Sequence, residues 1–265
     1  MQPTKAVIQA IAPTTDSRQV YAGPEFERWA RAEGLIAPER FLIEHYLRRD
    51  GSILEAGAGG GRILRALAQL GFEHISGFDN VPALIEQARR HDPSRAAAYR
   101  VLDARDVTYQ DGEFDQIVYL QQIISFISDA EGRQKAVAEA YRVLKADGIA
   151  LFSFLCFESR LQSAWHRAMI GYLACFRALA RRRQSAQSMP WLWLGGRFNL
   201  SAILDRPPHV YWFRCEDAVQ LLAEQRFTIV GIGTRAQTEQ QRLCGSVEEL
   251  RQMPMDGMLY VVCRK

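Results

Sequence analysis

Residues 38–155 alternate between short apolar runs and longer segments in which apolar residues recur at helical spacing. Short apolar runs are typical of buried strands, and recurrence every three to four residues is typical of amphipathic helices. The pattern predicts strands at 52–56, 74–78, 97–102, 114–120 and 149–155. It predicts helices at 38–49, 63–70, 81–90 and 130–145.

The alternation stops after residue 155 and resumes at residue 216, with a helix at 216–225 and strands at 227–232 and 258–263. Strands that alternate with helices predict an α/β fold. We expect a seven-stranded, mostly parallel sheet, doubly covered by helices, with a helical and aromatic insertion after strand five. Residues 1–155 and 216–265 would form one domain, and residues 156–215, here called the insertion, a lid above the carboxyl edge of the sheet.

One helix of the insertion is predicted to be amphipathic and basic. Its apolar face would consist of Leu161, Trp165, Ala168, Tyr172, Phe176 and Leu179, and its other face would carry Arg160, Arg167, Arg177 and Arg181. Such a helix can close over a substrate, lie on an anionic membrane surface, or pack on the sheet with solvated arginines. Polar breaks and modest length favour a lid or a structural cover over membrane contact.

Charge is concentrated in the insertion. The chain of 265 residues has a net charge of +3, yet residues 156–215 alone hold nine arginines, no lysine and two acids, a net charge of +7. This imbalance makes an anionic partner molecule one alternative. A nucleic-acid partner is disfavoured, because the overall charge is small and no RNA-binding module is recognisable.

The five cysteines are odd in number and widely scattered, so we expect reduced thiols and no metal site. The N-terminal apolar stretch is too short for a signal peptide, and no apolar run reaches the ~18 residues of a spanning helix. These features predict a cytoplasmic protein.

Three alternate glycines, Gly57, Gly59 and Gly61, separate the first strand from the next helix. Glycine lets the backbone approach a ligand where a β-carbon would collide. Asp79 ends the second strand, where a carboxylate can accept hydrogen bonds from both hydroxyls of a ribose. A nucleoside ligand is therefore expected, although the dinucleotide fingerprint would require glycine in place of Arg62.

This spacing resembles motif I of class I S-adenosylmethionine-dependent methyltransferases, E/D-x-G-x-G-x-G, which begins here at Glu55. Residues 77–85 resemble the family's second motif, residues 101–104 its third, and residues 112–118 the start of its fourth strand. The resemblance covers residues 53–155 closely and the last two strands loosely. It implies S-adenosylmethionine as cofactor, Asp79 on the ribose and Asp103 on the adenine amino group. The expected cofactor set is Glu55, Gly57, Gly59, Gly61, Asp79, Asn80, Asp103, Ala104 and Gln121.

The resemblance also implies an enzyme that aligns an acceptor with the methyl group for in-line transfer. A small-molecule acceptor is favoured, because the family's Asn-Pro-Pro-Tyr signature for nucleobase or amide methylation is absent after strand four. A ribonucleic-acid methyltransferase and a non-catalytic cofactor-binding protein remain alternatives.

Residues that would act on the acceptor are expected mainly in the insertion. His166 and His209 are candidate general bases, although a packed or solvated histidine is the commoner case. The candidate acceptor-binding residues are Gln122, Trp191, Arg197, Arg206 and Tyr211.

Overall fold

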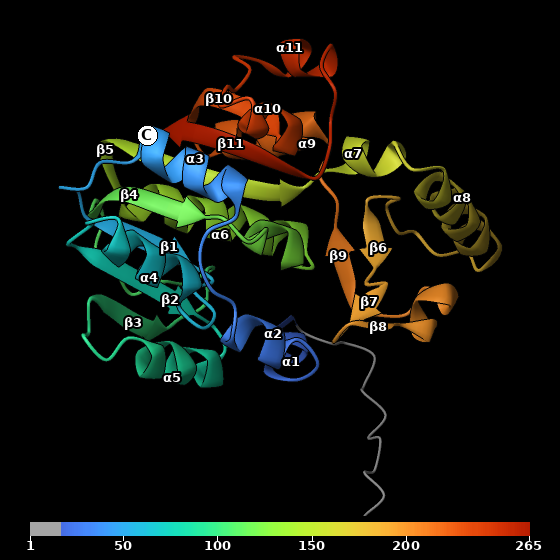
Figure 1. Ribbon diagram of the computed structural model, residues 1–265. Coiled ribbons are helices and arrows are strands. Elements are labelled where there is room, and N and C mark those ends of the chain that lie inside the picture. The colour runs from blue at the N-terminus through green and yellow to red at the C-terminus, as the bar shows by residue number, and fades with distance from the viewer. Residues whose placement is uncertain (1–16) are drawn as a thin grey trace, which may run out of the picture.

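The computed structural model describes residues 17–265, and residues 1–16, on which the signal-peptide prediction rests, lie outside that range. Seven strands form one sheet in the order β10-β11-β5-β4-β1-β2-β3 (Figure 1). Only β11 runs antiparallel to its neighbours, so the predicted seven-stranded, mostly parallel sheet is confirmed. The strands are β1 (Ile53–Ala56), β2 (Ile75–Asp79), β3 (Ala97–Val101), β4 (Phe114–Tyr119), β5 (Leu144–Leu155), β10 (Thr228–Thr234) and β11 (Met258–Arg264).

Both faces of the sheet are covered because successive strand residues point to opposite sides. Leu54 belongs to the core cluster that includes α6, whereas its neighbour Ile53 belongs to the cluster under α3 and α4. The helices are α3 (Ala37–Tyr46), α4 (Arg62–Gln69), α5 (Pro82–His91), α6 (Ala130–Val143), α9 (Cys215–Glu224), α10 (Arg235–Glu239) and α11 (Val247–Arg251).

The fifth strand starts earlier than the apolar run predicts. Leu144 already pairs with Phe114, and the register then shifts so that Ile149 pairs with Gln116. Asp147, at a φ of 62°, carries the chain through this irregularity. The predicted helix at 130–145 therefore ends at Val143, because the backbone pairs with β4 from Leu144 onwards.

Two short N-terminal helices, α1 (Ser17–Ala22) and α2 (Phe26–Ala30), were not predicted. They lie beside the carboxyl ends of the strands (Figure 1). The end of α2 contacts the glycine turn, where Gly60 donates its N–H to the carbonyl of Trp29 over 3.2 Å. A β-carbon at residue 60 would lie only 2.5 Å from the carbonyl oxygen of Ala30, so this contact requires glycine.

The insertion leaves the sheet and returns at neighbouring points. Phe213 donates its N–H to Leu155 and accepts one from Phe157, each over 2.8 Å. Five residues form its own small core, Met169, Leu173, Met189, Leu192 and Ala202. Its elements are α7 (Phe157–Leu161), α8 (Ala164–Leu179), β6 (Ser188–Pro190), β7 (Trp193–Leu194), β8 (Arg197–Phe198), the 3₁₀ helix η2 (Leu200–Leu204) and β9 (His209–Tyr211).

The predicted orientation of the helix in the insertion is wrong. The buried side chains of α8 are Met169, Leu173 and Arg177, and each lies one position after a member of the predicted apolar face. A helix turns about 100° per residue, so α8 is rotated by roughly that angle from the predicted orientation. Trp165 is consequently 62% exposed and Leu179 86% exposed.

A buried ion pair accounts for this rotation. The guanidinium of Arg177 donates to both carboxylate oxygens of Asp205 over 2.8 and 2.7 Å, and to the carbonyls of Ser185 and Ser188. An unpaired buried charge costs several kcal/mol, so the pair fixes which face of α8 turns inward. Among residues 17–265, no helix is both long and apolar enough to cross a membrane.

Candidate functional site

A pocket opens at the carboxyl ends of the central strands, beneath α1 and α2. Seven of the nine predicted cofactor residues line it, whereas Glu55 and Gly61 lie behind its wall. The seven are Gly57, Gly59, Asp79, Asn80, Asp103, Ala104 and Gln121. The sequence motifs therefore converge on one cavity.

The glycine turn forms the floor of this pocket. Gly57, Gly59 and Gly61 have φ values of 67°, 52° and 79°, a region that other residues adopt only with strain. A β-carbon at residue 57 would lie 2.0 Å from the Cδ1 atom of Ile123. A β-carbon at residue 59 would meet nothing closer than 3.8 Å, so the turn is open at that point.

Asp79 is held rigidly at the end of β2. Its carboxylate accepts the N–H groups of Gly59 over 3.0 Å and Val81 over 2.9 Å. Burial raises its pKa, and these backbone hydrogen bonds act in the opposite direction. Each carboxylate oxygen keeps a second lone pair, so Asp79 can still accept hydrogen bonds from hydroxyl groups in the pocket.

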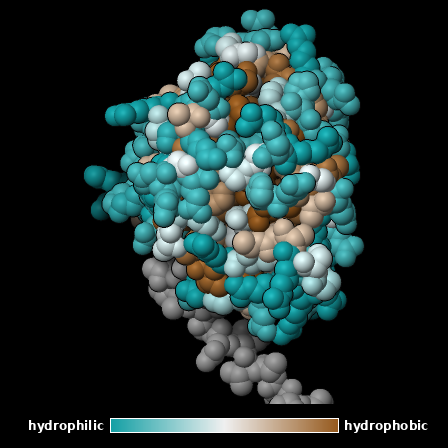
Figure 2. Space-filling view, turned by 90° about the vertical axis from the view of Figure 1, so that its left-hand side faces the viewer, coloured by the Kyte–Doolittle hydropathy of each residue, from teal (hydrophilic) through white to brown (hydrophobic). Residues whose placement is uncertain are grey.

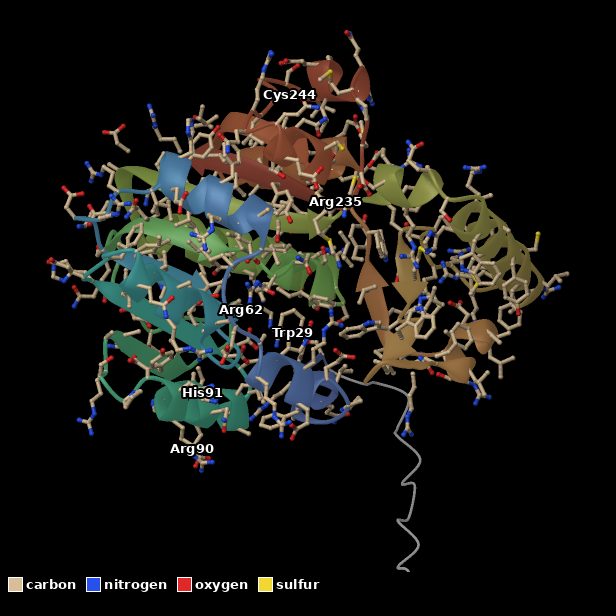
Figure 3. All side chains as sticks on the ribbon, in the orientation of Figure 1. Trp29, Arg62, Arg90, His91, Arg235 and Cys244 are labelled. Atoms are coloured by element: carbon tan, nitrogen blue, oxygen red, sulfur yellow. The ribbon has the colours of Figure 1, made fainter. Side chains whose placement is uncertain are left out.

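A polar network lies behind the glycine turn. Arg62 makes two hydrogen bonds of 2.6 and 2.7 Å to Glu39 of α3, and the Gln121 side chain donates to the same carboxylate over 2.8 Å. In Figure 3, Arg62 and Trp29 are labelled close together at the strand ends. A glycine at residue 62, as a dinucleotide fingerprint demands, would leave Glu39 buried without its cation.

Glu55 is buried beside this network, and its Oε2 atom has no hydrogen-bond partner. Burial raises its pKa well above the usual range, and nearby Arg62 opposes that shift. An unpaired buried carboxylate oxygen is costly, so it marks a place where a donor group or a water molecule would be stabilised. Glu55 thus suits a supporting position behind the pocket.

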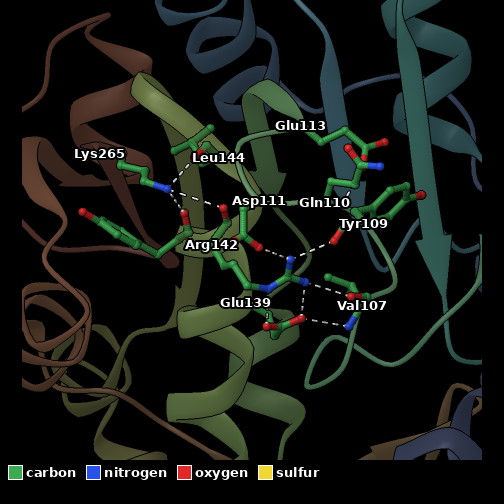
Figure 4. A network of polar contacts seen from close by, with 10 residues as sticks. Val107, Tyr109, Gln110, Asp111, Glu113, Glu139, Arg142, Leu144 and Lys265 are labelled. Atoms are coloured by element: carbon green, nitrogen blue, oxygen red, sulfur yellow. Dashed lines mark hydrogen bonds and ion pairs between the residues drawn. The ribbon is translucent and has the colours of Figure 1, made fainter.

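Asp103 also lines the pocket, on the loop that follows β3, the strand paired with β2. Arg105 forms a double hydrogen bond with it over 2.9 and 2.6 Å, and this pairing lowers the pKa of Asp103. The loop is tied to α6, since Arg142 donates to the carbonyls of Val107 and Tyr109 and Glu139 accepts the Val107 N–H (Figure 4). This network fixes the wall that carries Asp103.

Aromatic side chains close the pocket on the side away from the sheet. Tyr21, Trp29 and Phe126 line it, and Trp191 of the insertion stacks on Phe126 with ring centroids 5.0 Å apart. The ring of Tyr21 packs edge-on against the other three at 5.5 to 6.2 Å. Burial, then Asp79 and Glu25, raises the pKa of Tyr21 well above its usual value, so the phenol stays protonated.

The sequence alone did not identify Tyr21, Trp29 or Phe126 as site residues. Two of them come from the short helices α1 and α2, and Phe126 comes from the 3₁₀ helix η1 (Ile123–Phe126). The available signal was a tyrosine and a tryptophan in an otherwise polar N-terminal stretch. Such residues need burial to be stabilised, so they point to packing against another part of the chain.

None of the predicted acceptor-binding residues lines the pocket itself. Trp191 lies directly behind its wall, and Tyr211 packs on Arg133, whose guanidinium carbon is 4.0 Å from the ring centroid. Gln122 donates its backbone N–H to Ser153. Arg197 and Arg206 are exposed on the insertion.

Neither predicted general base reaches the pocket lining. His166 lies partly exposed on α8, and burial, then the charge of Arg160, lowers its pKa. His209 is bonded through Nε2 to Asp205 over 3.1 Å, within the ion pair of the insertion. The geometry therefore lends no support to a catalytic role for these histidines.

One other cluster of potential ligands lies where the insertion joins the sheet. The ligand atoms of Cys156, Glu158 and Cys215 all lie within 4.8 Å of one another. The two thiols contact Glu158 Oε2 at 3.7 and 3.6 Å, distances typical of weak sulfur hydrogen bonds. Spacing in sequence did not reveal this cluster, because the fold brings the two ends of the insertion together.

Comparisons with known proteins match the region that carries the pocket. Residues 54–152 fit the family model described as a methyltransferase domain. A putative methyltransferase, YqeM, of Bacillus subtilis is 31% identical over 42% of this chain and 44% of its own length. A glycine/sarcosine N-methyltransferase of Parasynechococcus marenigrum is 28% identical over 58% and 57%. The chain thus spans about half the length of these curated relatives.

Solved structures share the fold over most of the chain. An S-adenosylmethionine-dependent methyltransferase of Methanosarcina mazei superposes with a TM-score of 0.64 and 20% identity, covering 84% of this chain and 96% of that one. At this level of identity the likeness concerns the fold. The arrangement of the sheet and its covering helices therefore occurs in known proteins.

Proposed function

We propose that the protein is an S-adenosylmethionine-dependent methyltransferase that methylates a small-molecule acceptor at the pocket beneath α1 and α2, because residues 54–152 fit the family model described as a methyltransferase domain and the fold matches that of a solved S-adenosylmethionine-dependent methyltransferase. The observation that carries the proposal is the convergence of Gly59, Asp79 and Asp103 on one pocket with aromatic walls. The bound cofactor would supply an electrophilic methyl group for in-line displacement.

The residues present fit this cofactor. Gly59 leaves open space on the turn, and Asp79 offers buried acceptor lone pairs suited to ribose hydroxyls. Asp103 follows the neighbouring strand β3 and also lines the pocket, where its carboxylate is suited to the adenine amino group. The unpaired Oε2 of Glu55 lies buried near the glycine turn, where it would accept a hydrogen bond from a donor group of the cofactor or from a water molecule.

The aromatic wall supports an acceptor that is small and partly apolar. Tyr21, Trp29 and Phe126 would exclude water from the reacting atoms. Without water, electrostatic interactions between the protein and the reacting groups become stronger. Of the described residues that line the pocket, the titratable ones are Tyr21, Asp79, Asp103 and Arg105. With Asp79 and Asp103 committed to the cofactor, we propose an acceptor whose attacking atom carries a free lone pair at neutral pH.

The glycine/sarcosine relative, by its name, methylates the nitrogen of a small amino acid, and an acceptor of that kind would fit this proposal when it binds as the unprotonated amine. The insertion would act as a cover rather than supply a base. Its Trp191 buttresses Phe126 from outside the pocket. In this proposal, residues 1–155 and 216–265 bind the cofactor, and residues 156–215 form the accessory domain.

Calorimetric titration with S-adenosylmethionine, S-adenosylhomocysteine and NAD tests the cofactor assignment. Both adenosyl ligands should bind, NAD should not, and Asp79→Asn should weaken binding by roughly ten- to hundred-fold, since an amide accepts less well than a carboxylate. Asp92→Asn is a matched control, because Asp92 is also buried and accepts backbone N–H groups but does not line the pocket. Equal losses in both variants would contradict the assignment.

Release of S-adenosylhomocysteine over a panel of small amines, carboxylates and thiols tests the acceptor class. Turnover on at least one small molecule is expected. Turnover on bulk RNA alone, or on no acceptor while the cofactor still binds, would overturn the small-molecule proposal in favour of the two alternatives named above.

A further inference from the structure

The insertion carries most of the exposed hydrophobic surface of the molecule. Of the thirteen large hydrophobic side chains exposed among residues 17–265, nine belong to this segment of sixty residues. They are Leu161, Trp165, Tyr172, Leu179, Trp193, Phe198, Leu200, Ile203 and Leu204. By contrast, the side of the molecule opposite the insertion is largely hydrophilic (Figure 2). Exposed apolar patches of this kind mark interaction sites.

Five of these residues form what we call the outer apolar face, Trp165, Tyr172 and Leu179 of α8 with Leu200 and Ile203 of η2. The hydroxyl of Tyr172 donates to the carbonyl of Ile203 over 2.7 Å, so the two helices present one continuous surface. Leu179 is 86% exposed and Leu200 73% exposed. This face points away from the small core of the insertion, because Arg177 turns the other side of α8 inward.

The charges around this face are of one sign. Both acids of the insertion are committed elsewhere, Asp205 being 1% exposed in its ion pair and Glu158 facing two thiols. Seven of the nine arginines are exposed. Three of them, residues 181–183, follow α8 directly. An exposed apolar helix followed by an arginine tract has the character of an interfacial membrane helix.

We propose that the outer apolar face and residues 181–183 bind the surface of a lipid bilayer that contains anionic phospholipids. The apolar side chains would enter the boundary between headgroups and acyl chains, and the arginines would contact lipid phosphates. A second copy of the chain is a poorer occupant, because it would bring seven further exposed arginines against the same positive surface.

Flotation of the full chain with phosphatidylcholine vesicles, with and without phosphatidylglycerol, tests this proposal. The protein should float with the anionic vesicles only, and the bound fraction should fall as salt is raised, since the attraction to the surface is screened. Absence of binding, or equal binding to both vesicle types, would overturn it.

Two variants test the residues. Leu179→Glu should weaken vesicle binding at least about ten-fold, because it removes an apolar contact and adds a repelled charge. Arg181→Gln/Arg183→Gln should weaken it roughly thirty-fold, at about 1 kcal/mol per arginine. Arg95→Gln/Arg226→Gln is the matched control, since both arginines are exposed, lie outside the insertion and share the positive φ of Arg181.

All variants should show the hydrogen exchange of the unmodified protein across residues 164–211, which shows that the insertion remains folded. If the insertion variants bind vesicles as tightly as the control, the proposal fails. It fails equally if light scattering shows that Leu179→Glu converts a dimer into a monomer while vesicle binding is absent, because the face would then belong to a second copy.

Discussion

The seven-stranded sheet buries apolar side chains on both faces, whereas the insertion closes around five core residues and one buried ion pair. In the sheet, apolar side chains on both sides of each strand pack against the covering helices, so apolar contacts determine how these helices are oriented. In the insertion, the ion pair between Arg177 and Asp205 determines the orientation of α8. The face of α8 that carries more apolar residues is therefore exposed to solvent.

This difference shows that hydrophobic pattern determines orientation only where the core is large. A buried Leu or Phe contributes about 1.5 to 3 kcal/mol, so a face of several such residues normally outweighs a single polar group. A buried charge costs several kcal/mol if it is left unpaired, which is enough to reverse that outcome in a small core. The predictions below are arranged by the size of the effect expected from disturbing each region.

The largest effect should come from breaking the ion pair of the insertion. Arg177→Met removes the bidentate partner of buried Asp205, which keeps only Arg182 at 3.6 Å and His209 at 3.1 Å, and should cost about 3 to 5 kcal/mol of local stability. Hydrogen exchange should then accelerate across residues 164–211, while S-adenosylmethionine still binds, weakened by no more than the loss of the Trp191 contact. Arg197→Met, at an exposed arginine of the same segment, is the control. A cost below about 1 kcal/mol would show that the pair does not hold the insertion together.

The next largest effect concerns the glycine turn of the sheet region. Gly57→Ala places a β-carbon 2.0 Å from Ile123 at a φ of 67°, and cofactor affinity should fall by about a hundred-fold or more. Gly34→Ala is the control, because Gly34 has a φ of 66° but no neighbour within 4 Å. Calorimetric titration measures the cofactor affinity of both variants. If Gly57→Ala and Gly34→Ala bind the cofactor equally well, the contact between a β-carbon at residue 57 and Ile123 does not affect binding.

A smaller effect is expected where the two regions meet. Trp191→Ala removes the ring that stacks on Phe126 and packs against Tyr21, so α1 should loosen and cofactor affinity should fall by about ten-fold. Trp191→Phe keeps an aromatic ring and should retain most of the affinity. If both variants bind the cofactor normally, the insertion does not support the pocket.

The smallest effect is a pH dependence confined to the insertion. Burial lowers the pKa of His209, and Asp205 only partly offsets this, so the unfolded chain binds the proton more readily than the folded one. The stability of the insertion should therefore fall as pH drops below about 6.5 towards the lowered value. His209→Gln should weaken this dependence in thermal unfolding and leave only the contribution of His166, whereas His74→Gln, at an exposed site, should retain it in full. If the melting temperature of His209→Gln depends on pH as steeply as that of the unmodified protein, His209 is not the group responsible.

Much of the sheet could be predicted from sequence because its signals are local and redundant. Residues 149–155 of β5 combine a nearly continuous apolar run with the turn signal at residues 147–148. The motifs around Gly57 and Asp79 lie at the ends of β1 and β2. Since parallel strands end at one edge, predicting the strands also placed the motifs beside one another. The cofactor side of the pocket followed from this.

The rest depended on contacts between distant segments. Tyr21 and Trp29 reach the pocket only because α2 packs on Gly60, more than thirty residues away, and neither short helix has a strong pattern of its own. The orientation of α8 depended on Asp205, a single acid that no periodicity connects to Arg177. Chain-distant polar pairs of this kind carry no periodic signal.

The hydrogen bonds that join Leu155, Phe157 and Phe213 make the insertion exchangeable between proteins. A segment that departs and returns at adjacent backbone positions leaves the path of the sheet unchanged, whatever its length or composition. The strands that carry the pocket can therefore keep their register while the length of the segment at this junction changes. Residues 156–215 are accordingly where insertions and deletions should disturb the sheet least.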